Sequence, residues 1–103
     1  MPKQLSIHDA QHMISSNSDV IIYDIRDQAS FDAGHIPGAQ MLSVDMIPSI
    51  SFENKAKPVL VCCYHGVSSQ AAANFLASQG FAEVYSIMGG YTAWSEHFNV
   101  EKT

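Results

Sequence analysis

The chain has 103 residues, of which 47% are hydrophobic, and ten acidic against five basic side chains give a formal net charge of −5. This length predicts one domain with a modest but sufficient hydrophobic core. The acidic balance argues against nucleic acid or an anionic membrane as a partner. No apolar stretch is long enough to span a membrane, and the N-terminal segment lacks the apolar core of a signal peptide. We therefore expect a cytoplasmic protein with reduced thiols.

The first half of the chain alternates helix-like and strand-like segments. A serine at position 6, followed by an acid three residues later, predicts the start of a helix that runs to about residue 15. The continuous apolar run over residues 20–25 is typical of a strand that is buried on both faces. Residues 28–33 favour one or two helical turns, residues 41–44 a short strand, and residues 45–50 a weak helix.

The second half repeats this alternation with stronger signals. A proline opens a strand over residues 59–62, and residues 68–79 form the best helix of the chain, which a glycine ends. A third clear strand covers residues 83–87, and residues 91–97 form a terminal helix after two glycines. Strands that alternate with helices imply an α/β fold, in which helices cover both faces of a mostly parallel sheet.

The strongest functional signal is the cysteine at the end of the second clear strand. Cys63 is the last residue before a short loop with a central glycine, and a helix starts on the far side of that loop. Loop N–H groups and a helix N-terminus favour the thiolate, which is the nucleophilic form of cysteine. Ligands of open α/β sheets bind outside the carboxyl ends of strands, where this thiol lies. Cys62 points to the other side of the strand and is interpreted as a core residue.

Three motifs, in order along most of the chain, resemble the signatures of rhodanese domains. The first comprises residues 24–26 and 30–39, the second is the loop over residues 63–69, and the third covers residues 89–94. The loop sequence Cys-Tyr-His-Gly-x-Ser-Ser and the short chain are similar to single-domain bacterial rhodaneses of the glycerol phosphate regulon type, which are thiosulfate sulfurtransferases. The resemblance implies one rhodanese domain over residues 1–103, with a central, mostly parallel sheet of about five strands.

The resemblance also implies a reaction. The Cys63 thiolate would take the outer sulfur of thiosulfate or a related donor, carry it as a persulfide, and pass it to cyanide or a thiol. The expected partners are this small-molecule donor and acceptor, or a small redox protein as acceptor, and no metal or organic cofactor is needed. The loop would hold the anion beside catalytic Cys63. The expected substrate-binding residues are Tyr64, His65, Gly66, Val67, Ser68 and Ser69.

Two residues of this segment are left open by the sequence. His65 could act as a base or an orienting group for the cysteine, but a tight loop usually turns its side chains outward, which favours a place on the rim. Gln70 ends the loop where close relatives tend to have a basic residue. The resemblance therefore implies a pocket that is less positive than usual, which favours an uncharged or protein-borne sulfur donor.

Two other function classes compete with thiosulfate sulfur transfer. A cysteine phosphatase or arsenate reductase needs an arginine six positions after its cysteine, because the guanidinium grips the oxyanion with two hydrogen bonds. That position is Ser69, and the single arginine, Arg26, lies outside the loop and is interpreted, with Asp24, as structural. The other class is a persulfide carrier that does not use thiosulfate, or a rhodanese-like regulatory module, serving a protein partner.

Overall fold

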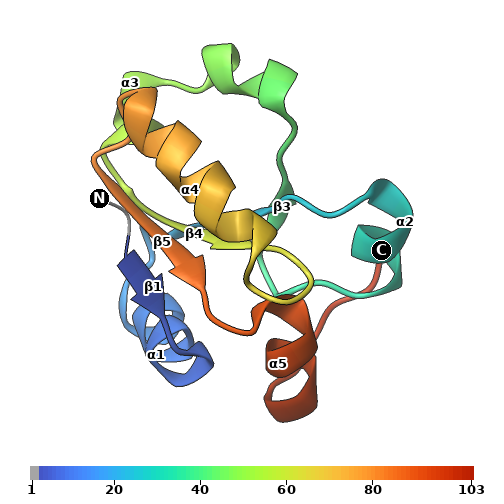
Figure 1. The fold of residues 1–103 in the computed structure, drawn as a ribbon. Coiled ribbons are helices and arrows are strands. Elements are labelled where there is room, and N and C mark those ends of the chain that lie inside the picture. Colours follow the sequence, from blue (N-terminus) through green and yellow to red (C-terminus); the bar gives the residue numbers. More distant parts are fainter. Residues whose placement is uncertain (1–2) are drawn as a thin grey trace.

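Five parallel strands form the centre of the molecule, in the spatial order β1-β5-β4-β2-β3 (Figure 1). The computed structural model describes residues 3–103. In chain order the elements are β1 (Lys3–Leu5), α1 (Ile7–Ser16), β2 (Ile21–Asp24), α2 (Gln28–Ala33), β3 (Gln40–Met41), the 3₁₀ helix η1 (Val44–Ser49), α3 (Phe52–Lys55), β4 (Pro58–Cys62), α4 (Ser68–Ser78), β5 (Glu83–Ile87) and α5 (Gly90–His97).

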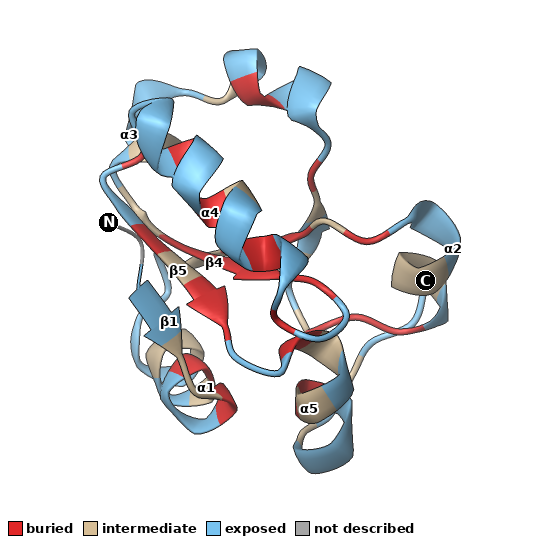
Figure 2. Ribbon diagram, in the orientation of Figure 1, coloured by how far each residue is buried: buried red, intermediate tan, exposed pale blue. Residues whose placement is uncertain are grey.

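Helices cover both faces of the sheet, which confirms the predicted α/β architecture (Figure 1). Side chains alternate along the strands, so Tyr23 and Val61 pack with α4 while Ile22 and Leu60 pack with α1 and α5. Figure 2 shows the buried residues running along β4 and β5 and the sides of the helices that face them. The molecule therefore has two hydrophobic cores, one on each face of the sheet.

Local signals explain most of the element boundaries. The Ser6 side chain accepts a hydrogen bond from the Asp9 N–H at 3.1 Å and caps α1, as its position predicted. The segment predicted as a weak helix is the 3₁₀ helix η1, which contains Pro48. Among the described residues, none of the helices has both the length and the apolar character that crossing a membrane requires.

Three short elements differ from the expectations drawn from the sequence. β1 was not predicted, because Lys3–Leu5 has no apolar run, and it exists through parallel pairing with β5. The short strand expected over residues 41–44 is β3, Gln40–Met41, and η1 follows it. The helix α3 was also not predicted, since it spans only Phe52–Lys55 and depends on a cap from the Ser51 side chain.

Candidate active site

The sulfur of Cys63 lies at the carboxyl end of β4, where the chain leaves the sheet and turns into α4. Its Sγ atom accepts hydrogen bonds from the backbone N–H of Gly66 at 3.1 Å and of Ser69 at 3.3 Å. The Ser69 hydroxyl oxygen lies 3.3 Å from the same sulfur. Burial raises the pKa of Cys63, but hydrogen bonds from Ser69 and from the loop backbone outweigh it and hold the pKa below its ordinary value. The site therefore favours a thiolate.

The Ser69 hydroxyl is itself in contact with a second buried hydroxyl, that of Ser86. Ser86 on β5 has its Oγ atom 2.6 Å from Ser69 Oγ, and both serines are buried. When Cys63 is a thiolate it can only accept, so the Ser69 hydrogen points at the sulfur and Ser86 must donate to the Ser69 oxygen. Ser86 thus fixes the direction of the Ser69 hydroxyl. The sequence did not reveal this role, because a serine in an alternating strand carries no distinctive signal.

The loop has its shape because of a glycine that no other residue can replace without strain. Gly66 has φ +81°, and a Cβ atom there would meet the backbone N of Gly89 at 2.6 Å and the Ile87 carbonyl at 2.9 Å. The backbone of the turn between β5 and α5 therefore packs directly against the loop at Gly66. The first turn of α5 adds two hydrogen bonds, from the Tyr91 N–H to the Cys63 carbonyl at 2.7 Å and from the Thr92 N–H to the Tyr64 carbonyl at 3.0 Å.

Cys62 occupies the opposite environment to its neighbour, as alternation along the strand predicted. It has no exposed surface and packs in the core under α1 and α5, beside Leu60 and Ile87. Burial raises the pKa of Cys62, and the nearby carboxylate of Asp24 raises it further. This thiol stays protonated and belongs to the core, which leaves Cys63 as the candidate nucleophile.

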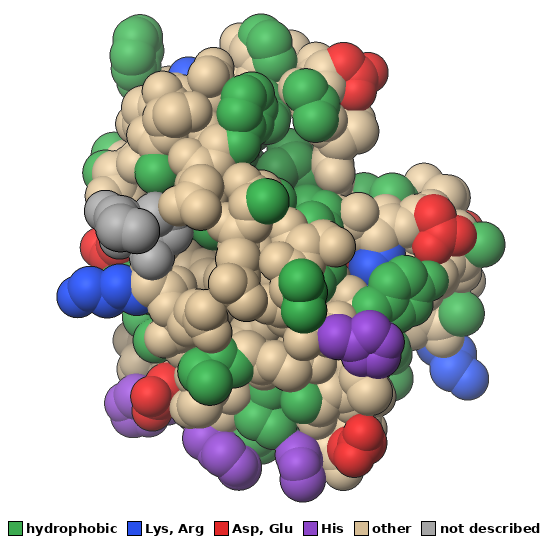
Figure 3. Space-filling model, in the orientation of Figure 1, with side chains coloured by type: hydrophobic (Ala, Val, Ile, Leu, Met, Phe, Trp, Pro, Cys, Tyr) green, Lys and Arg blue, Asp and Glu red, His purple; other side chains and the backbone are tan. Residues whose placement is uncertain are grey.

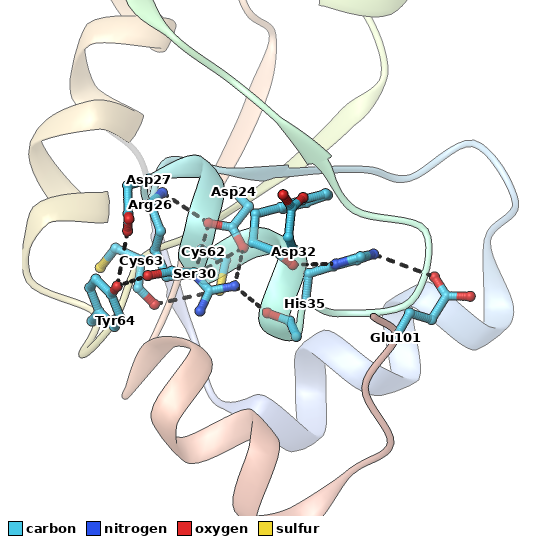
Figure 4. Close-up of polar contacts among 12 residues, drawn as sticks. Asp24, Arg26, Asp27, Ser30, Asp32, His35, Cys62, Cys63, Tyr64 and Glu101 are labelled. Carbon is cyan, nitrogen blue, oxygen red and sulfur yellow. Dashed lines mark hydrogen bonds and ion pairs between the residues drawn. The ribbon is translucent and has the colours of Figure 1, made fainter. Parts of the chain in front are cut away.

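The first sequence signature is mainly architectural, but its arginine lies closer to the site than expected. Arg26 forms a buried ion pair with Asp24 at 2.8 Å and also donates to the Gly34 carbonyl (Figure 4). Its guanidinium lies over the Tyr91 ring, 4.0 Å from the ring centre. Although Arg26 is outside the loop in sequence, it lines the Cys63 cavity. The structural role is confirmed, and the place on the cavity wall is new.

Tyr64 and Asp27 form another part of the wall of the Cys63 cavity. The Tyr64 hydroxyl donates to the Asp27 carboxylate at 3.1 Å and also contacts the Ser30 hydroxyl (Figure 4). Hydrogen bonds from Ser30 and Tyr64 lower the pKa of Asp27, so its carboxylate stays ionised at neutral pH. A negative charge therefore lines the cavity, which the sequence did not indicate.

The cavity at Cys63 has a volume of about 390 Å³. Exposed loop side chains form its rim, while the buried Gly66 and Ser69 bond to the sulfur. Gln70 does not line the cavity; its side-chain amide donates to the Gly66 carbonyl at 2.8 Å and fastens the loop. The expected loop residues that line this cavity are Tyr64, His65, Val67 and Ser68.

A family model for the rhodanese-like domain matches residues 6–97. The chain belongs to the rhodanese-like family. Two relatives named thiosulfate sulfurtransferase GlpE are similar over 94% of the chain: one from Pseudoalteromonas translucida, 44% identical over 92% of its own length, and one from Coxiella burnetii, 45% identical over 91%. The resemblance to this bacterial group, drawn from the three motifs, is confirmed.

Solved structures agree with this family assignment. The rhodanese-like domain of the Anabaena protein Alr3790 superposes with a TM-score of 0.85 at 28% identity, over 100% of this chain and 81% of that domain. A Rhodopseudomonas palustris protein described as a possible tyrosine phosphatase has a TM-score of 0.84 at 28% identity, over 97% of this chain and 85% of its own. The fold therefore does not separate the two chemistries, and the loop must decide between them.

Proposed function

We propose that the protein is a sulfurtransferase that moves sulfane sulfur from thiosulfate, or a related donor, to cyanide or a thiol through a persulfide on Cys63. The observation that carries this proposal is the Cys63 sulfur itself, with two backbone N–H groups and a hydroxyl within 3.3 Å. Relatives about 45% identical over most of the chain are named thiosulfate sulfurtransferase, which supports the same reaction.

The first step transfers one sulfur atom to the enzyme. The Cys63 thiolate attacks the outer sulfur of thiosulfate, a new S–S bond forms to Sγ, and the S–S bond of thiosulfate breaks as sulfite leaves with the electron pair. The negative charge moves to the outer sulfur of the persulfide. The N–H groups of Gly66 and Ser69 already converge on Sγ, so the loop stabilises charge beside it without reorganising.

The second step discharges the persulfide. Cyanide, a thiolate or the thiol of a small redox protein attacks the outer sulfur, the bond to Sγ breaks, and Cys63 leaves as a thiolate. Its lowered pKa makes Cys63 a better leaving group as well as a ready nucleophile. Both cysteines are free thiols, and this reaction needs Cys63 reduced, so we place the protein in the cytoplasm.

Phosphoryl transfer is disfavoured by the residue at position 69. A phosphatase of this loop type needs a guanidinium there, whereas Ser69 is buried between Cys63 and Ser86. Intact-mass analysis after incubation with thiosulfate tests the proposal. We expect a gain of one sulfur atom that cyanide removes and that is absent in Cys63→Ser. A protein that gains no sulfur but hydrolyses an aryl phosphate would overturn it.

A rhodanese-like module that serves a partner is the remaining alternative. In that case the persulfide would form from a protein-borne donor and would not form from thiosulfate. The same mass experiment separates the two, because a carrier loaded only by a protein stays at its unmodified mass in thiosulfate.

A further inference from the structure

A second cavity adjoins the one at Cys63, and the sulfur-transfer steps leave it unused. Its volume is about 470 Å³, within the ~300–1,000 Å³ typical of small-molecule sites. Figure 3 shows hydrophobic side chains gathered in the hollow between α4 and the segment that carries η1. We call this cavity the α4 groove. The residues that define it are Leu42, Val44, Ile47, Ala71, Ala72 and Phe75.

The α4 groove lies next to the Cys63 cavity. The two residues that line both are Ile25 and Arg26. Along α4, Ser68 lines the Cys63 cavity while Ala72 and Phe75 line the groove, and residues four and seven positions apart share one face of a helix. From Ser68 to Phe75 this face is about 10 Å long. A ligand with its sulfur at Cys63 can therefore lay roughly six to eight carbons along the groove.

Apolar side chains on the groove remain in contact with water. Phe75 has 43% of its surface exposed, although the helical pattern groups it with the inward-facing Leu76, and Val44 is 71% exposed. The alanines between them are small and leave the space open. A ligand chain in this space would remove apolar surface from water, which is favourable in proportion to the area covered.

The charges at the site are poorly matched to an anion. Among the described residues that line the two cavities, Arg26 is the only lysine or arginine, and its charge is paired with Asp24. The carboxylate of Asp27 also lines the Cys63 cavity. A dianion meets this carboxylate and no unpaired side-chain cation, whereas an uncharged chain is indifferent to both.

We propose that the α4 groove binds the apolar chain of a small thiol, which is the sulfur acceptor of the enzyme. This inference rests on the proposed sulfur transfer. The acceptor thiolate attacks the outer sulfur of the Cys63 persulfide, an S–S bond forms to the acceptor, and the bond to Cys63 Sγ breaks. The electron pair leaves with Sγ, so an alkyl persulfide and the Cys63 thiolate are formed with no added oxidant or reductant.

A chain-length series of acceptors tests the proposal. The persulfide is first loaded with thiosulfate, and its discharge by ethanethiol, butanethiol and hexanethiol is followed by intact mass. We expect the second-order rate constant to rise about two- to fourfold for each added methylene. A rate constant that does not change with chain length, on an enzyme that cyanide still discharges, would overturn the groove while leaving sulfur transfer intact. An enzyme that never gains sulfur would instead refute the proposed function.

Two matched variants locate the effect on α4. Ala71→Leu fills the groove with a residue that suits a helix, and we expect the ratio of the hexanethiol to the ethanethiol rate to fall close to one. Ala77→Leu makes the same change at an exposed position of α4 outside the groove, and should keep the wild-type ratio. The proposal is wrong if Ala71→Leu retains the full ratio, or if Ala77→Leu lowers it equally.

Discussion

Cys62 and Cys63 are neighbours in the chain, yet the protein shifts the pKa values of their thiols in opposite directions. Cys62 points into the core under α1 and α5, where burial raises its pKa and keeps it a thiol. Cys63 points into the loop, where N–H and hydroxyl donors lower its pKa despite burial. The last residue of a strand and the first residue of the loop that follows can therefore lie in different environments, one in the core and one among backbone donors. Deep burial without such donors keeps Cys62 protonated, whereas the hydrogen-bond donors around Cys63 outweigh its burial.

Substituting each of the two cysteines separately is the strongest test of this contrast. Cys63→Ser should lower turnover at least about a thousandfold, because a hydroxyl is far less ionised than a thiol. Cys62→Ala should keep turnover and lose about 1–2 kcal/mol of unfolding free energy through its core contacts. Steady-state assays and urea denaturation measure both effects. The opposite pattern, with activity lost in the Cys62 variant alone, would reverse the assignment.

The shape of the loop can be broken without touching either sulfur. Gly66→Ala should lower turnover by about a hundredfold and destabilise the fold by about 1–3 kcal/mol, since the new Cβ meets backbone atoms of the β5–α5 turn. Gly80→Ala is the control, because Gly80 also has positive φ but lies away from the site in open surroundings. Normal turnover in Gly66→Ala would show that the backbone donors are not what activates Cys63.

The hydrogen bond between the buried Ser69 and Ser86 offers a finer test of how the pKa of Cys63 is lowered. Ser86→Ala should shift the pH midpoint of Cys63 alkylation upward by about one pH unit, because Ser69 then loses the group that directs its hydroxyl. Val84→Ala removes a buried side chain two residues before Ser86 on the same face of β5 and should leave the midpoint in place. In a Ser69→Ala background, Ser86→Ala should have no further effect, and additive shifts would show that Ser86 does not act through Ser69.

Charge added at the end of the loop should act weakly. Gln70→Lys places a cation near the loop but outside the cavity lining, so we expect the KM for thiosulfate to fall by no more than about threefold in low salt. The effect should vanish in high salt, because exposed charges are screened. Steady-state kinetics at two salt concentrations measure this change. A tenfold or larger fall would mean that residue 70 faces the substrate path.

The dependence of stability on pH should separate the two thiols by its sign. The pKa of folded Cys63 lies below its unfolded value, so its contribution is present above the unfolded pKa and is lost as pH falls through the folded pKa. The pKa of folded Cys62 is raised, so its contribution is present below the unfolded pKa and is lost at higher pH. The difference in unfolding free energy from wild type should therefore change with pH in opposite directions for Cys63→Ala and Cys62→Ala. Denaturant unfolding at a series of pH values measures both slopes.

Much of the fold was predictable because its signals are local. The apolar run that forms β4, the cap at Ser6 and the glycine in the loop each specify a conformation from a few neighbouring residues. β1 and α3 were missed because they depend on tertiary contacts or on very short capped turns. Their residues carry no periodic pattern, and only the edge of the existing sheet makes Lys3–Leu5 a strand.

The position of the candidate nucleophile was predictable from the sequence, and the residues that form the cavity walls were less so. Cys63 follows from strand position and loop composition, which are both written in consecutive residues. Ser86, Asp27 and the cavity-lining role of Arg26 arise where β5 and the end of β2 meet β4 in space. The residues next to Cys63 in the sequence do not indicate them, because parallel strands bring together segments that are far apart in the chain.

The two hydrogen bonds from α5 to the loop have a consequence for biosynthesis. The ribosome makes Cys63 well before Tyr91 and Thr92, whose N–H groups hold the Cys63 and Tyr64 carbonyls. A nascent chain that ends before α5 lacks these donors and the turn that supports Gly66. The loop and Ser69, which donate to the Cys63 sulfur, are present in such a chain, but the contacts that hold the loop in place are missing. We therefore expect the thiol to reach its full reactivity only after α5 has docked against the loop.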